Sequence, residues 1–147
     1  DQHDVILSEM KVRVQKLRNL PSGEKVSTPM AVVVGKSDMW IHALPHPIQT
    51  DLFTDGQLNL PTLAKNSAML RAFLMKHAPK VVSNSEAFSS NVKYFAASSF
   101  GHVPPLVPYD GGKKSAPDPA RLKPFQVEVP PLWILSQVTP GLVPSQT

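Results

Sequence analysis

The chain has 147 residues, with 15 Lys and Arg against 11 Asp and Glu, a formal net charge of +4, 16 prolines and no cysteine. This length suits one domain, and the 18% of charged residues excludes an acidic or lysine-rich disordered chain and a long coiled coil. Without cysteine, the chain has no disulfide framework, thiolate zinc site or cysteine nucleophile.

The first 60 residues predict two strands. Residues 11–15 alternate polar and apolar side chains, and residues 31–34 form a β-branched run typical of a buried strand. Pro21-Ser22-Gly23 indicates a turn between them. Residues 4–10 could form a short helix, although their apolar side chains do not gather on one side. Residues 38–44 and 50–60 stay undecided, apart from a turn at Asp55-Gly56.

Two helices are predicted in the middle of the chain. The first begins at Pro61, ends at Ala78-Pro79, and places four apolar side chains on one face at helical spacing: Leu63, Leu70, Phe73 and Leu74. The second begins at the capping-box pattern Ser83-Asn84-Ser85-Glu86 and ends near Gly101, with Phe88, Val92 and Phe95 along it. The short connection predicts an antiparallel helical hairpin.

The last third of the chain differs in composition. Of the 16 prolines, 6 fall in residues 1–101 and 10 in residues 102–147, which is too many for a helix or a central strand. We therefore expect an extended, proline-rich arm, which contacts neighbouring subunits through Phe125, Leu132, Trp133, Ile134 and Leu135. The alternative is an arm that folds back on its own domain. The prolines and polar residues of the uncharged run 129–147 argue against a membrane span.

A basic segment is the main candidate for binding nucleic acid. Its cations, with no acid between them, are Lys11, Arg13, Lys16 and Arg18. On a strand, Lys11 and Arg13 would share one face that could meet phosphates. The alternative is an ordinary solvated face.

Other motifs are weaker. Gly35-Lys36-Ser37 resembles the end of a phosphate-binding loop, but Met30 occupies the position of the required glycine, which favours a strand followed by a turn. Pro45 and Pro47 prevent a helix that would align His42 and His46 for a metal ion. Asp1-Gln2-His3 could chelate Cu(II) only at a free amino terminus. No catalytic motif, metal site or cofactor site is predicted.

These observations predict an α+β fold: a compact domain over residues 1–101, with a few strands packed by a two-helix hairpin, and a proline-rich extended arm over residues 102–147. The leading functional hypothesis is a non-enzymatic structural subunit of a large assembly, of the virus coat, nucleocapsid or organellar ribosome type. Its expected partners are protein subunits of the same oligomeric assembly, in a virion or inside the cell, without a membrane. An RNA- or DNA-binding protein that uses residues 11–18 is the alternative, and an enzyme is the third hypothesis.

Overall fold

The fold is built around a two-stranded parallel sheet. The computed structural model describes residues 2–21 and 23–147, with side chains from Val5 onward. The sheet pairs β1 (Met30–Val34) with β4 (Val92–Ala96), so that Val32 lies beside Tyr94. The predicted Asp1-Gln2-His3 motif and the turn at Pro21-Ser22-Gly23 include residues outside the described part.

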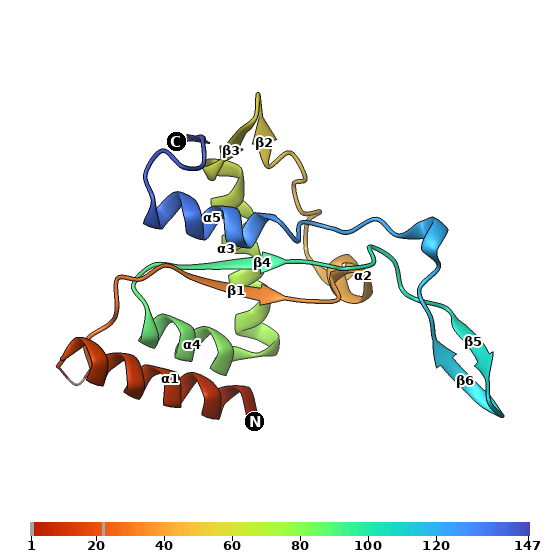
Figure 1. Ribbon diagram of the computed structural model, residues 1–147, viewed down its shortest axis with the longest axis horizontal. Coiled ribbons are helices and arrows are strands. Elements are labelled where there is room, and N and C mark those ends of the chain that lie inside the picture. Colours follow the sequence, from red (N-terminus) through yellow and green to blue (C-terminus); the bar gives the residue numbers. More distant parts are fainter. Residues whose placement is uncertain (1, 22) are drawn as a thin grey trace.

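Helices cover both faces of the sheet (Figure 1). Because side chains alternate along a strand, Tyr94 and Phe95 point to opposite faces. Tyr94 packs in a cluster with Leu70 of α3 (Leu60–His77) and with α4 (Pro79–Phe88), whereas Phe95 packs with Trp133 of α5 (Val129–Val138). The first helix, α1 (Gln2–Arg18), packs on α4.

Smaller elements complete the chain. α2 (Ser37–Trp40) and the 3-10 turn η1 (Ile41–Ala43) follow β1. β2 (Phe53–Thr54) and β3 (Gln57–Asn59) form a hairpin, and the last strand, β7 (Ser145–Gln146), pairs parallel to β3. The hairpin of β5 (Leu106–Tyr109) and β6 (Gly112–Ser115) precedes η2 (Pro119–Arg121) and projects away from the body in Figure 1.

The structure confirms the α+β class, the first predicted helix and the second predicted strand. Helix α3 begins where Asn59 Oδ1 accepts a hydrogen bond of 3.0 Å from the Thr62 N–H, with Pro61 in the first turn. Its face buries Leu63, Leu70 and Leu74, while Phe73 is only half-buried. The turn at Asp55-Gly56 is also confirmed.

Two predicted elements are wrong. Residues 11–15 belong to helix α1, where their polar side chains point to several sides instead of one. The second predicted helix, from Ser83 to Gly101, is replaced by α4, which starts earlier at Pro79 and ends at Phe88. Residues 92–96 instead form β4, because they pair with β1 and bury Tyr94 and Phe95 on the two faces of the sheet.

The prediction of an extended arm is wrong for residues 129–138, which form helix α5. Pro130 and Pro131 lie in the first turn of this helix, where a proline costs no intrahelical hydrogen bond, and Pro140 follows its end. Among the described residues, no helix has both the length and the apolar character needed to cross a membrane. The division of the chain at Gly101 stays a prediction, because it concerns whether residues 1–101 fold without the rest.

Candidate functional site

The β5–β6 hairpin is the most protruding feature of the described chain (Figure 1). Leu106 lies opposite Ser115, and Tyr109 opposite Gly112, around the two-residue turn Asp110-Gly111. Both turn residues have positive φ, 40° and 76°, as the tight turn of a two-residue hairpin requires. The turn chemistry of the local sequence therefore favours the hairpin, and no helix or other sheet makes an extensive contact with it in the described part of the chain.

Apolar side chains of the hairpin are left in solvent. Leu106 is 67% exposed and Tyr109 is 58% exposed, and the two side chains point to opposite faces because they are three positions apart along the strand. The ammonium of Lys114 lies 3.8 Å from the centre of the Tyr109 ring, a cation–π contact on one of these faces. Both faces of the hairpin thus present an apolar group.

The base of the hairpin is fixed to the body by hydrogen bonds. The Lys123 N–H donates to the Phe100 carbonyl at 3.0 Å. The His102 ring lies 3.1 Å from the same carbonyl through Nδ1, and its Nε2 accepts from the Asp118 N–H at 3.3 Å. Gly101 has φ of 69°, and a Cβ there would lie 1.8 Å from the Lys123 carbonyl oxygen. The segments that enter and leave the hairpin are therefore held together where they meet the body of the protein.

Helix α1 separates the four predicted nucleic-acid-binding cations. At 3.6 residues per turn, Lys11 and Arg13 point about 160° apart, so they do not share the face that a strand would give them. Lys16 lies near Arg13, and Arg18 near Lys11, by the same spacing. Arg13 also makes an exposed ion pair with Glu9 at 3.7 Å. Helix α1 thus divides the four cations between two sides instead of placing them on one basic face.

The five predicted arm residues are divided between the core and the surface. Trp133 is 2% exposed and packs with the Phe95 ring at 5.6 Å between centres. Phe125 is half-buried, with its N–H donating to the Ser98 carbonyl at 2.8 Å. Leu132 and Ile134 are also half-buried, and Leu135 is 39% exposed. Trp133 therefore contacts its own domain, as the folded-back alternative predicts.

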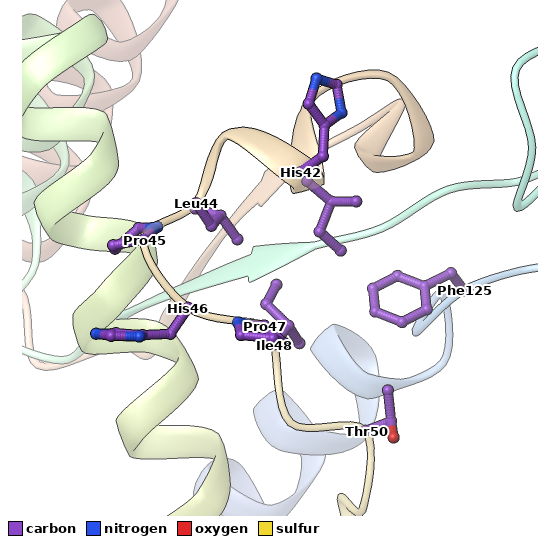
Figure 2. Close-up of a pocket in the computed structure, with 9 residues that line it drawn as sticks. His42, Leu44, Pro45, His46, Pro47, Ile48, Thr50 and Phe125 are labelled. Carbon is purple, nitrogen blue, oxygen red and sulfur yellow. The ribbon is translucent and has the colours of Figure 1, made fainter.

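An apolar pocket has a volume of about 350 Å³, and its lining includes the two loop histidines, His42 and His46. Figure 2 shows the residues that line it. The His42 ring points away from Phe125, and the His46 ring points toward α3, so the two imidazoles do not converge. Within residues 5–21 and 23–147, no group of three metal-ligating side chains lies together. Ile48 and Phe125 supply apolar walls to the pocket.

A second hollow, of about 320 Å³, lies at the carboxyl ends of β1 and β4. Of the three residues that resemble the end of a phosphate-binding loop, Ser37 lines this hollow; its N–H donates to the Ala97 carbonyl at 3.1 Å, and α2 is a single turn. Ser98 Oγ donates to the Asp38 carboxylate and accepts from the Gly101 N–H at 2.9 Å. These groups close the turn, and the strand-and-turn interpretation of residues 31–37 is confirmed.

Three titratable side chains with shifted pKa values lie together, one each on α3, α4 and β4. Arg71 Nη2 donates to Glu86 Oε2 at 2.8 Å, and the Tyr94 hydroxyl donates to Glu86 Oε1 at 3.0 Å. The hydrogen bond from Arg71 holds the pKa of Glu86 below its ordinary value. Burial, and then the hydrogen bond to Glu86, raise the pKa of Tyr94. The Arg71, Glu86 and Tyr94 side chains therefore form a hydrogen-bonded cluster that joins α3 and α4 to the sheet.

The sequence contained a signal for the hairpin that the prediction missed. Asp110-Gly111 is a strong two-residue hairpin pattern, and it separates Leu106-Val107 from Lys113-Lys114. The proline content of residues 102–147 obscured this signal, because it favoured one continuous extended arm. The chain matches no known family model, no curated protein and no solved structure.

Proposed function

We propose that the chain is a non-enzymatic structural subunit of a larger assembly and that its β5–β6 hairpin docks on a neighbouring copy of the chain. The main support is the exposure of Leu106, 67%, and Tyr109, 58%, on opposite faces of a projecting hairpin. A two-stranded hairpin alone is marginally stable in water. Contact with a neighbour would cover both side chains and stabilise the hairpin at the same time.

The fixed base of the hairpin supports the same proposal. Because the Lys123 N–H donates to the Phe100 carbonyl and the Asp118 N–H donates to His102 Nε2, the base of the hairpin is ordered before it meets a partner. Such preorganisation reduces the conformational entropy that binding would cost. Virus coat, nucleocapsid and organellar ribosome proteins are examples of the type of subunit we propose, in a virion or an intracellular assembly.

Sedimentation velocity tests the docking of copies. We expect the purified chain to form species larger than a monomer as its concentration rises, and we expect the double substitution Leu106→Ser and Tyr109→Ser to abolish them. The matched control, Met39→Ser and Val127→Ser, removes side chains that are 53% and 44% exposed elsewhere, and it should leave assembly unchanged. A wild-type chain that stays monomeric at its solubility limit would refute the proposal.

Binding of RNA or DNA is the second candidate. An exposed ring with a lysine above it, as in Tyr109 and Lys114, is the type of group on which unpaired bases stack. We expect a single-stranded oligonucleotide to bind with an affinity that falls with salt, by a slope of about 0.7 per phosphate contact. Substituting Lys113 and Lys114 by Gln should flatten that slope if the hairpin binds; substituting Arg13 and Arg18 should flatten it if α1 binds. No binding at low salt would exclude both.

A further inference from the structure

The outer edge of strand β1 has no partner strand. The Met30 N–H donates to the Asn91 carbonyl at 2.8 Å, and the Val34 carbonyl accepts from the Ala97 N–H at 3.1 Å, so these residues face β4. Polar backbone groups alternate in direction along a strand, and those of Ala31 and Val33 therefore point away from β4. Among the described residues, none makes a hydrogen bond with them.

The two edges of the sheet differ. The outer edge of β4 is covered by α3, where the Ser67 hydroxyl accepts from the Tyr94 N–H at 2.9 Å. On β1, the outward backbone groups have no hydrogen-bond partner among the described residues and none of the five residues is buried, although α5 packs on the strand. The prediction of a buried strand at residues 31–34 is thus wrong as to burial, with Val33 48% exposed. Residues 30–34 are an apolar run of the kind found in central strands, but in this structure they form an unpaired edge of the sheet.

Exposed edges usually have a device that blocks pairing, such as a proline, a charge or a bulge. The β5–β6 hairpin has such devices, with Pro108 on one strand and Lys113 on the other. Strand β1, Met-Ala-Val-Val-Val, contains none of them. Its open edge is therefore suited to receive another strand.

An apolar groove of about 600 Å³ adjoins this edge. Met30 and Ala31 belong both to the groove and to β1, so the groove and the unpaired edge are continuous. On the opposite wall, α1 contributes Met10, 48% exposed, and Leu17, 83% exposed. Side chains of an added strand could therefore enter the groove while its backbone pairs with Ala31 and Val33.

The charge around the groove indicates what occupies it. Arg18 is the one charged residue among the described residues that line the groove. A second copy that paired through the same edge would bring its own Arg18 to this side of the sheet, where like charges repel. An acidic segment would instead be complementary in charge.

We propose that the β1 edge and the α1 groove bind an extended segment of another protein, with alternating apolar side chains and acidic residues at its ends, which adds to the sheet as a third strand beside β1. Main-chain hydrogen bonds would provide affinity, while the groove and Arg18 would provide selectivity. This proposal is independent of the hairpin, so its failure leaves the proposed function untouched.

A pair of synthetic peptides tests the proposal on the full chain. The probe is Asp-Glu-Val-Thr-Val-Thr-Val-Glu-Asp with blocked ends, and its control has lysine in place of each acidic residue. We expect the acidic peptide to bind and to slow hydrogen exchange of the Ala31 and Val33 amides. Its affinity should fall as salt rises, because the contacts at the rim of the groove are electrostatic. The lysine peptide should bind several-fold more weakly.

Two substitutions distinguish charge from strand pairing. Arg18→Glu should weaken binding several-fold, whereas Lys65→Glu makes the same charge change on the exposed side of α3 and should not. Val33→Pro should abolish binding, because it removes an outward N–H while leaving the ladder with β4 in place. The far-UV spectrum of Val33→Pro reports whether this variant folds. If it does not fold, Arg18→Glu and its control Lys65→Glu provide the test. Equal binding of both peptides, no protection of the two amides, or a peptide-free dimer that already protects them would each overturn the proposal.

Discussion

Replacement of Trp133 by alanine tests whether α5 is an integral part of the fold. Trp133 is 2% exposed and packs with Phe95 at 5.6 Å between ring centres. Truncation of a buried aromatic side chain costs about 3–5 kcal/mol, of which the aromatic pair provides about 0.5–1.5 kcal/mol. Since a small domain has about 5–15 kcal/mol of stability in total, we expect Trp133→Ala to be only marginally folded.

The measurement is urea denaturation followed by far-UV circular dichroism. Leu135→Ala is the matched control on the same helix, because the Leu135 side chain is 39% exposed, and we expect it to cost less than about 1 kcal/mol. Alanine favours a helix more than tryptophan does, so lost helix propensity cannot explain a large effect at position 133. A loss at Trp133 as small as that at Leu135, with an unchanged slope in urea, would refute the placement of α5 against the sheet.

Two further predictions concern the hydrogen-bonded cluster of Arg71, Glu86 and Tyr94 and the base of the hairpin. The pKa of Glu86 is lowered from 4.5 by Arg71, so the stabilising effect of the carboxylate is present above that value and is lost as the pH falls through the lower folded-state value. Urea midpoints below pH 4.5 should therefore fall less steeply for Glu86→Gln than for the wild type, and parallel curves would contradict this. Gly101→Ala should cost at least about 2 kcal/mol, because alanine is strained at positive φ and its Cβ would meet the Lys123 carbonyl. Gly111→Ala has the same type of φ but open space around it, and equal losses in thermal melts would show that the contact is unimportant.

Short-range patterns account for the correct predictions. Helix α3 was predictable because Pro61, the apolar spacing of Leu63, Leu70 and Leu74, and the ending at Pro79 all lie within one segment. The same approach gave only a possible short helix at residues 4–10 and a strand at residues 11–15, whereas α1 spans both, because the alternation of residues 11–15 is also compatible with a helix. The prediction missed that residues 2–18 contain no proline or glycine, which permits a long helix.

The candidate sites were less predictable than the fold. The basic residues of α1 were identified, but their distribution around the helix depends on a secondary structure that was predicted wrongly. The exposed positions of Leu106 and Tyr109 were not predicted, because the hairpin was interpreted as part of a continuous arm. An apolar residue in a sequence does not reveal whether another part of the chain covers it.

The sequence by itself determined the α+β class, helix α3 and the strand at residues 31–34, because turn chemistry, periodicity and β-branched runs act between near neighbours. Tertiary structure alone decided that residues 92–96 form a strand beside β1, that Trp133 is buried in the core, and that Val33 lies at an open edge. β4 pairs with a strand 62 positions earlier in the chain, and Trp133 packs on Phe95, 38 positions away, so burial and pairing between distant residues outweigh local propensity.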